Sequence, residues 1–344
     1  MSFMLNEFLC APDAVREVIS GNKKVIAAIA KEFKARKITN ITTVARGTSD
    51  NAATFFKYLA EAIGGIMVSK FSPSITTVYG STVNLGNNMV MALSQSGMSP
   101  DTIMVLESAK KTGALTVAVT NNPDSPLAKI CDYHIYLVAG EERSVAATKT
   151  FVCQLATMYM LANELSEKPA KMNISSMPAK LSDFIAESKD ELKDFAEHTK
   201  FLNNYVILSR GLLQTVSSEL SLKMMESCYT FSRPFSTCEF MHGPLSLIGE
   251  GSNVVMLAPD SEFKEEFIDM ARRLALLGAN IVAFTDIKEV FDVATYAYRM
   301  PSLRGMDTPF IYTMAIELYV AFMAEALGRD PDAPRNRKKI TMTK

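Results

Sequence analysis

The sequence predicts an α/β protein with two tandem doubly wound parallel sheets flanked by helices, and three observations support this fold class. Short apolar runs rich in β-branched residues alternate with longer stretches of helical period, which is the pattern of parallel α/β units. That pattern occurs twice along the chain. The chain also has 344 residues, 48% of them hydrophobic and 21% charged, and this is enough apolar material for two such sheets.

In the first half of the chain, five apolar runs each lead into a loop and predict strands, at residues 40–50, 64–71, 87–96, 114–122 and 132–140. Stretches of helical period lie between or after these runs, at residues 51–63, 99–113 and 144–165. Between residues 166 and 200 the chain is rich in Lys and Glu with amphipathic spacing, which predicts a helix that links two domains.

The order of elements then begins again. NITTVARGTSDNAATFFKYLAE is echoed by NYVILSRGLLQTVSSELSLKMME, and both segments place an Arg-Gly pair between a strand and a helix, with Arg46 and Arg210 164 positions apart. ALTVAVTN and ANIVAFTD repeat at nearly the same offset, which favours a duplication over chance similarity. The predicted parts are a first domain with N-terminal helices at residues 1–165, a linking helix at 166–200, a second domain at 201–328 and a tail at 329–344.

The charge and cysteine content argue against several classes of protein. Lys and Arg total 36 against 37 Asp and Glu, and the net charge of −1 gives no basis for binding nucleic acid or a membrane surface. The five cysteines have neither metal spacing nor a disulfide framework, so we expect reduced thiols and no metal site. The N-terminus has no basic leader region and no run approaches eighteen apolar residues, so we expect a soluble cytoplasmic protein.

A polar turn directly follows one apolar run, in the stretch MALSQSGMSPDT. Ser99 and Pro100 stand where the N-cap and first residue of a helix are expected. Helix N-termini at the carboxyl ends of parallel strands favour anions, and hydroxyls with backbone amides can bind phosphate without a lysine. An ordinary capped turn needs only one serine, so the four polar side chains predict a phosphate site: Ser94, Gln95, Ser96 and Ser99. The chain has neither a P-loop nor a dinucleotide glycine motif.

Three motifs of the first half, ARGTSDNAA, SQSGMSPDT and AGEERSVAATKTF, resemble the sugar isomerase (SIS) domain family. In the second half, ELSLKMMESCYTFSRPFSTCEFMHGPLSLI and the tail DAPRNRKK resemble the isomerase half of glucosamine-6-phosphate synthase. The resemblance extends from about residue 20 to the end, and it is closer to the stand-alone isomerising glucosamine-6-phosphate deaminases. No glutaminase domain precedes the first strand, so we expect no ammonia donor in this chain.

The resemblance implies flavodoxin-like sheets, a phosphosugar substrate and no cofactor, with a C-terminal tail that closes over the active site. It also implies which residues line the sugar pocket beside the serine turn: Gly47, Thr48, Ser49, Val145 and Ala147.

A group of charged residues in the second half suits proton transfer. Glu219, Lys223 and Glu226 lie at i, i+4 and i+7, on one face of an expected helix, although this spacing equally fits a solvated surface pair. His242 lies before a Gly-Pro turn, in a chain with three histidines. Ketose–aldose interconversion uses such groups, because a carboxylate can move a proton between C1 and C2 and an imidazole with a pKa of about 6.5 can open the sugar ring.

The resemblance assigns these roles to individual residues. Glu226 corresponds to the C1–C2 base and His242 to the ring-opening histidine, which the synthase takes from the neighbouring subunit. A homodimer is therefore implied, with His242 contributed across the interface. Glu219 and Lys223 correspond to residues that support the base and the sugar hydroxyls.

The tail lysine of the family, which forms an imine with the ketose, corresponds to Lys339, although Lys338 is adjacent. An unperturbed lysine is protonated at neutral pH, so an imine would need a depressed pKa. Glucosamine 6-phosphate already carries its nitrogen, and in a deaminase Lys339 could instead only order the tail.

Two positions depart from the synthase. Ala147 stands where the synthase has a serine that contacts the sugar, so one polar contact is lost. Ala45 and Arg46 replace a small residue and a cysteine before the Gly-Thr-Ser turn. Arg46 could bind an oxyanion of the substrate or pair with Asp50, and we expect the pairing with Asp50.

The leading hypothesis is an isomerase-type deaminase that converts glucosamine 6-phosphate and water to fructose 6-phosphate and ammonia. A deglycase that splits 6-phosphofructosamines into glucose 6-phosphate and an amine would use the same machinery. Synthesis from free ammonia is a further alternative. From another class, a sugar-phosphate sensor is less favoured, because there is no room for a helix-turn-helix domain before the first strand.

Overall fold

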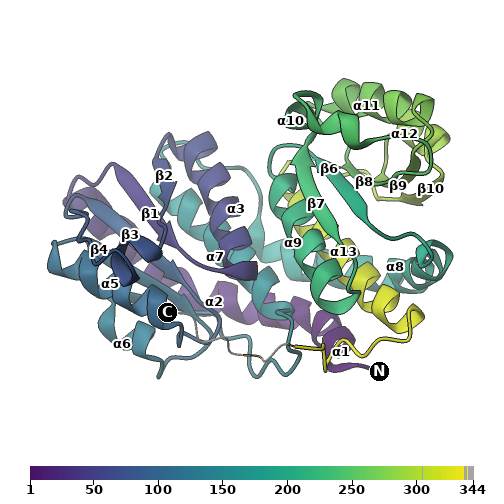
Figure 1. Ribbon diagram of the computed structural model, residues 1–344. Helices are drawn as coiled ribbons and strands as arrows, with labels where there is room; N and C mark the ends of the chain where they lie inside the picture. The colour runs from purple at the N-terminus through teal and green to yellow at the C-terminus, as the bar shows by residue number, and fades with distance from the viewer. Residues whose placement is uncertain (304, 337–338, 340–344) are drawn as a thin grey trace. The chain divides into compact units, whose positions relative to one another are not determined.

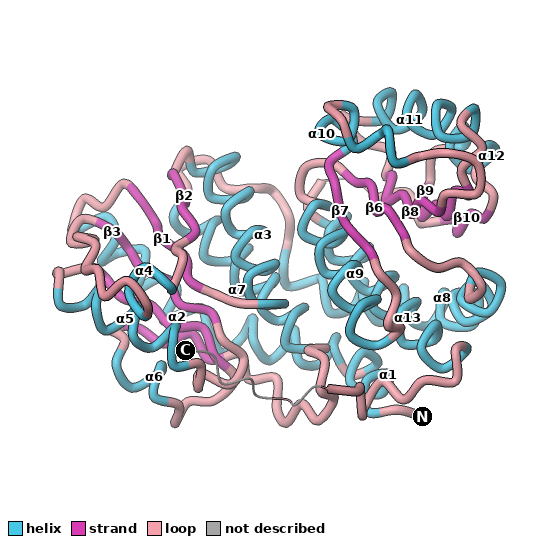
Figure 2. The backbone as a smooth tube through the Cα atoms, in the orientation of Figure 1, coloured by secondary structure: helices cyan, strands magenta, loops and turns pink. Residues whose placement is uncertain are grey.

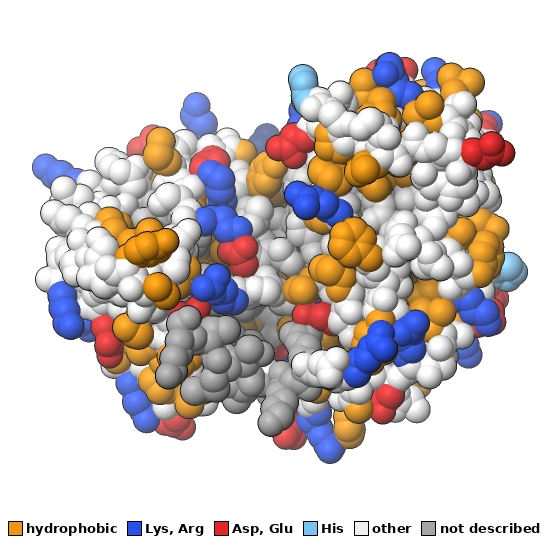
Figure 3. Space-filling view, in the orientation of Figure 1, with side chains coloured by type: hydrophobic (Ala, Val, Ile, Leu, Met, Phe, Trp, Pro, Cys, Tyr) orange, Lys and Arg blue, Asp and Glu red, His pale blue; other side chains and the backbone are white. Residues whose placement is uncertain are grey.

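The structure is a computed structural model that describes residues 1–303, 305–336 and 339 (Figure 1). The chain divides into two compact units, each with one sheet. The first-sheet unit contains Cys10–Ala179 and Arg335–Lys344, and the second-sheet unit contains Met1–Leu9 and Lys180–Pro334. On the face shown in Figure 3, acidic and basic side chains are interspersed rather than gathered by sign.

The first-sheet unit has a five-stranded parallel sheet in the order β2-β1-β3-β4-β5. Its strands are β1 (Asn40–Val44), β2 (Met67–Lys70), β3 (Asn88–Leu93), β4 (Leu115–Thr120) and β5 (Tyr133–Tyr136). All six residues of β4 are buried. A central strand covered by helices on both faces of a parallel sheet needs such a continuous apolar run.

Helices cover both faces of this sheet (Figure 2). On one face, α7 packs against both α2 and α3, and on the other α5 contacts α4 and α6. These helices are α2 (Ala11–Ala35), α3 (Gly47–Gly64), α4 (Ser74–Thr77), α5 (Pro100–Lys111), α6 (Pro126–Ile130) and α7 (Lys149–Leu165). A short 3-10 turn, η1 (Ile174–Ser176), leads into α8 (Met177–Thr199), within the expected linking segment.

The second-sheet unit repeats this arrangement. Its parallel sheet has the order β10-β9-β8-β6-β7. The strands are β6 (Tyr205–Ser209), β7 (Ser232–Ser236), β8 (Asn253–Ala258), β9 (Asn280–Thr285) and β10 (Tyr296–Arg299). The helices are α1 (Phe3–Leu9), α9 (Leu213–Ser227), α10 (Thr237–Met241), α11 (Lys264–Leu276), α12 (Lys288–Val293) and α13 (Asp307–Ala326), with a 3-10 turn η2 (Pro244–Leu247).

Taken from the opposite edge, the second sheet has the order β7-β6-β8-β9-β10, which matches β2-β1-β3-β4-β5 element for element. Arg46 follows β1 and Arg210 follows β6, at equivalent points of the two sheets. The tandem parallel sheets predicted from the sequence are therefore confirmed.

The compact units differ from the predicted limits at both ends of the chain. The backbone N–H groups of Phe3 and Met4, in α1, donate to the carboxylate of Asp332 at 2.5 and 2.9 Å, and α1 contacts α13. The first nine residues therefore belong with the second sheet, while Arg335–Lys344 belong with the first.

Among the described residues, α13 is the one helix long and apolar enough to cross a membrane. Its most apolar window is 89% buried inside the protein. It also carries Glu317, which is completely buried. These features are those of a core helix that packs against α9.

Candidate active site

A cavity of about 310 Å³ lies at the carboxyl ends of β1 and β3 in the first-sheet unit. This is the edge at which open parallel sheets bind ligands. The nine residues predicted to bind sugar or phosphate all line it, together with Lys339, and their contact with a ligand remains a prediction. The lining also includes four other residues, Arg46, Leu93, Thr102 and Glu142.

The serine turn is shaped by local hydrogen bonds. The hydroxyl of Ser94 accepts the N–H of Gly97 at 3.2 Å, and Gly97 has a φ of 65°. A Cβ at Gly97 would lie 2.2 Å from the hydroxyl oxygen of Ser125, so the turn requires glycine there. Ser99 occupies the N-cap position of α5, but its hydroxyl lies 3.4 Å from that of Ser94 and makes no capping bond. The serine hydroxyls and the start of α5 together suit an anion.

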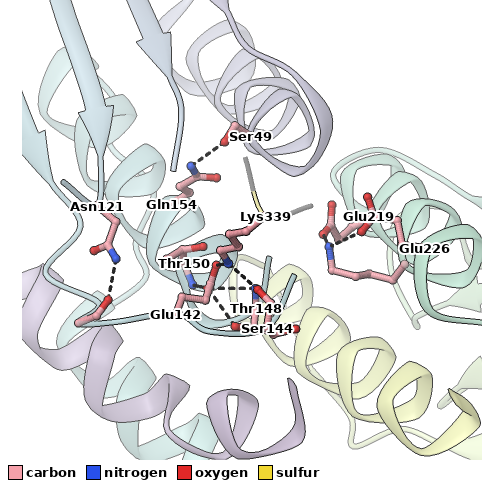
Figure 4. Close-up of polar contacts among 12 residues, drawn as sticks. Ser49, Asn121, Glu142, Ser144, Thr148, Thr150, Gln154, Glu219, Glu226 and Lys339 are labelled. Atoms are coloured by element: carbon pink, nitrogen blue, oxygen red, sulfur yellow. Dashed lines mark hydrogen bonds and ion pairs between the residues drawn. The ribbon is translucent and has the colours of Figure 1, made fainter. Parts of the chain in front are cut away.

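Ser49, in the first turn of α3, is held by a residue outside the cavity lining. Its hydroxyl accepts a hydrogen bond from the amide of Gln154 on α7 at 3.0 Å (Figure 4). Both side chains are buried. Packing of α3 against α7 therefore fixes the position of this turn relative to the sheet.

The expected pairing of Arg46 with Asp50 is wrong. The Nε atom of Arg46 lies 3.0 Å from Asp101, near the start of α5, whereas Asp50 pairs with Lys70 at 2.5 Å. Asp101 is 1% exposed and the Arg46 side chain is 57% exposed. A buried carboxylate needs a charged or hydrogen-bonding partner more than an exposed one does, which favours Asp101 over the nearer residue in sequence.

Sequence reasoning missed Glu142, which is fully buried between β5 and α7. One carboxylate oxygen, Oε2, accepts the N–H groups of Thr148 and Thr150, each at 3.0 Å, and the hydroxyl of Thr148 at 2.9 Å. Burial would raise the pKa of Glu142, but the charge of Lys339 and the hydrogen bonds from Lys339 and Thr150 hold this pKa below its ordinary value. Its signal was present in the motif AGEERSVAATKTF.

Lys339 reaches the cavity from the tail. Its Nζ donates to the other oxygen of Glu142, Oε1, at 2.8 Å and to the backbone carbonyl of Ser144 at 2.6 Å (Figure 4). The side chain is 27% exposed. The lysine favoured by the sequence motif therefore lies in the lining of the predicted sugar pocket, while Lys338 lies outside the described residues.

The second-sheet unit holds a buried charge cluster on α9. Glu219 and Lys223 are completely buried and their charged atoms are 2.5 Å apart, while Glu226 is 11% exposed with its Oε2 3.8 Å from Nζ of Lys223. Burial would lower the pKa of Lys223, but the charges of Glu219, Glu226 and Glu317 raise it above its ordinary value. The solvated pair that the spacing also allowed is therefore wrong.

His242 directly follows α10 and is exposed. Its backbone N–H donates to the carbonyl of Glu239 at 3.0 Å. Exposure leaves the imidazole accessible to another chain, and the part assigned to His242 across a subunit interface remains a prediction. Among the described residues no group of three His, Cys, Asp or Glu side chains is arranged to hold a metal.

Tandem sheets of this order, with a polar cavity at the strand ends of one of them, define a tandem doubly wound α/β protein with a site suited to an anion. Comparisons with known proteins specify the family. Residues 20–164 match the SIS domain. A protein from Silicibacter pomeroyi assigned as a phosphosugar isomerase is 30% identical, with a TM-score of 0.84 over 96% of this chain and all of that one. The chain therefore belongs to the SIS domain family of phosphosugar isomerases.

Two further relatives have more specific names. The chain is 29% identical to the isomerising glutamine–fructose-6-phosphate aminotransferase of Thermococcus kodakarensis, over 98% of this chain and 57% of that protein. It thus spans little more than half the length of this relative. The glucosamine-6-phosphate deaminase of Thermotoga maritima has the same fold, with a TM-score of 0.79 over 99% of this chain and all of that one, at 21% identity.

Proposed function

We propose that this protein is an isomerase-type deaminase that converts glucosamine 6-phosphate and water to fructose 6-phosphate and ammonia. The observation that carries the proposal is the cavity of the first-sheet unit, in which the serine turn, the Gly-Thr-Ser turn and Lys339 all form the lining. We also propose that it works in the cytoplasm as a homodimer, without metal or cofactor.

In this proposal the serine turn binds the phosphate with hydroxyl and backbone N–H donors, helped by the N-terminus of α5. Arg46 and Lys339 supply positive charge in the same cavity. These contacts hold the open sugar in one orientation for proton transfer between C1 and C2. Positioning of this kind contributes much of the rate enhancement in reactions that need little covalent chemistry from the protein.

The chemical steps balance without an external oxidant or reductant. His242 acts as acid and base to open the ring. Glu226 removes the proton from C2 and returns it to C1, while the aldehyde oxygen gains a proton and the C2 amine loses one. The aldehyde thus becomes a hydroxymethyl group and C2 becomes an imine. Water adds to that imine, and ammonia leaves as the C2 ketone forms.

The test is a coupled assay on the purified protein with glucosamine 6-phosphate and a panel of 6-phosphofructosamines. We expect ammonia and fructose 6-phosphate from glucosamine 6-phosphate, with activity lost in Glu226→Gln. Glu187→Gln, an exposed glutamate on α8, is the matched control and should keep full activity.

Other products would replace the proposal with a specific alternative. Glucose 6-phosphate and an amine from a fructosamine would identify a deglycase. Glucosamine 6-phosphate formed from fructose 6-phosphate and ammonia, with no measurable reverse reaction, would identify synthesis. Sugar-phosphate binding without any turnover would identify a sensor.

The proposed place of His242 has its own test. In a dimer whose sites combine Glu226 of one subunit with His242 of the other, mixing inactive Glu226→Gln and His242→Gln chains creates one intact site in each mixed dimer. Random reassortment should therefore restore roughly a quarter of wild-type activity. No restoration after refolding of the mixture would place both residues in one subunit's site.

A further inference from the structure

The two carboxylate oxygens of Glu142 have separate partners. Oε2 accepts three hydrogen bonds from Thr148 and Thr150, at the start of α7. Oε1 accepts the ammonium of Lys339. A negative charge at a helix N-terminus is stabilised by the helix dipole and the free N–H groups, so Oε2 anchors the carboxylate. Oε1 remains available to Lys339.

Lys339 lies 197 positions after Glu142 in the sequence, and it supplies the opposite charge that the buried carboxylate of Glu142 requires. Its ammonium has three N–H donors, of which Glu142 and the carbonyl of Ser144 receive two. Lys339 also lines the cavity beside the serine turn, so its positive charge is available to an anionic ligand there.

The pair also sets the charge of the cavity. Among the described residues, the charged ones in its lining are Arg46, Glu142 and Lys339, and the buried Asp101 already pairs with Arg46. Without Lys339 in place, the carboxylate of Glu142 would stand uncompensated in a cavity that is to receive a phosphosugar dianion. Like charges at short distance in a partly desolvated site repel strongly.

We propose that Glu142 is a positioning residue that holds Lys339 in the cavity, so that anion binding requires the tail lysine in place. This inference rests on the proposed phosphosugar substrate and adds a residue to its site. Glu142 acts through Lys339 and does not itself contact the substrate. Binding of an anionic sugar and formation of the Glu142–Lys339 pair then favour each other, because each is linked to the same charge balance.

Glu142→Gln is the first test, with Glu141→Gln as the matched control. Glutamine keeps one carbonyl oxygen for Thr148 and Thr150 but removes the charge that Lys339 faces. Glu141 is exposed, so its substitution makes the same change in net charge beside the site. We expect Glu142→Gln to weaken binding of fructose 6-phosphate roughly tenfold and to speed amide exchange in the C-terminal peptide containing Lys339. Glu141→Gln should change neither.

The second test uses Lys339→Met, which changes a tail residue and spares the core. It should weaken fructose 6-phosphate binding more than Glu142→Gln does, because it leaves the carboxylate uncompensated. Adding Glu142→Gln to Lys339→Met should then restore part of the affinity. If Glu142 were needed only for the structure of the cavity, the double variant would instead bind fructose 6-phosphate more weakly than Lys339→Met alone.

Failure of this inference is distinguishable from failure of the proposed function. If tail exchange and affinity in Glu142→Gln match Glu141→Gln, or if the double variant binds more weakly than Lys339→Met alone, the inference is overturned. Binding and exchange need no turnover, so a protein that binds fructose 6-phosphate through this pair but deaminates nothing would overturn only the proposed function.

Discussion

The two sheets of this protein have the same strand order but different strand-end chemistry. In the first, the strand β3 is followed by Ser94-Gln95-Ser96, and Arg46 pairs with Asp101. In the second, β8 is followed by Pro259-Asp260-Ser261, and Arg210 lies 3.3 Å from Glu266, near the start of α11. The arginine–acid pair is kept at the equivalent point of both sheets.

What differs is the space beside that pair. Arg210 also lies over the ring of Phe263, 5.2 Å from its centroid, and a Cβ at Gly211 would come 3.0 Å from the same ring. An aromatic side chain and acidic neighbours thus occupy the second sheet where the first has hydroxyls and an open cavity. In the proposed function, the anion is therefore bound at the first sheet.

The helix that follows the first strand of each sheet also differs, and here it is the second copy, α9, that carries the charged residues. At the offset of 164 residues, Glu219 and Lys223 of α9 correspond to Phe55 and Leu59 of α3, and all four are fully buried. A buried ion pair seldom stabilises a fold more than an apolar pair of the same volume. The proposed function gives this pair a chemical part, with binding on the first sheet and proton transfer by residues of the second-sheet unit.

The largest expected effect comes from breaking the α9 cluster. Lys223→Met leaves buried carboxylates without their cation and should lower the free energy of unfolding by about 3–5 kcal/mol. Leu59→Met, at the equivalent position, should cost less than about 1.5 kcal/mol. Urea unfolding of both variants measures the difference. Adding Glu219→Leu to Lys223→Met should recover part of the loss, and equal costs for the two methionine variants would contradict the functional interpretation.

The two buried ion pairs should also respond differently to acid. The pKa of Glu142 is lowered by Lys339, so the stability from its ionisation is present above the unfolded value of about 4.3 and is lost as pH falls through the lower folded value. The pKa of Lys223 is raised, so the stability that comes from its positive charge does not change between pH 3 and 7. The wild-type advantage over Glu142→Gln, about 1.5–3 kcal/mol at pH 7, should therefore disappear only below about pH 4.3. Thermal unfolding from pH 3 to 7 measures it, and an advantage already absent at pH 6 would contradict the pairing.

Glycine substitutions separate binding from folding. Gly97 and Gly211 have φ values of 65° and 58°, so backbone strain alone should cost alanine about 1–2 kcal/mol at either. Gly97→Ala should cost more, because its Cβ would also collide with Ser125. Only Gly97→Ala should also weaken fructose 6-phosphate binding, because it alone distorts the serine turn. Calorimetric titration of both variants checks this. Equal loss of affinity in Gly211→Ala would show that the second sheet also contributes to anion binding.

The smallest expected effect concerns the equivalent arginines. Arg46→Gln and Arg210→Gln each remove a partly exposed ion pair, so each should change stability by at most about 1 kcal/mol. Since Arg46 lines the cavity, Arg46→Gln should also raise the KM for glucosamine 6-phosphate several-fold at unchanged kcat. An unchanged KM would show that Arg46 pairs with Asp101 but takes no part in substrate binding.

The features that the sequence predicted well are those encoded locally. The alternation of apolar runs and helical stretches predicted both sheets, since parallel strands buried on both faces need continuous apolar segments. The serine turn was recognisable because Ser94, Ser96 and Ser99 lie within six positions. Such a cluster lies on one short turn, so it can be recognised without knowing the long-range contacts of the chain.

The features that the sequence did not predict depend on long-range contacts. Glu142 was overlooked within the motif AGEERSVAATKTF because its partner, Lys339, lies 197 positions away. Arg46 was paired with the wrong acid, because Asp101 is 55 positions distant and Asp50 is in the adjacent turn. Glu317 lies in a strongly apolar helix, and its effect on Lys223 arises only where α13 packs on α9.

The most direct test of the division between binding and proton transfer is to measure affinity and turnover together in Glu226→Gln. The account predicts a wild-type dissociation constant for fructose 6-phosphate by calorimetric titration and no release of ammonia from glucosamine 6-phosphate. Substantial turnover in this variant would contradict the assignment of the base. Lost affinity with an intact fold would contradict the separation of the two tasks.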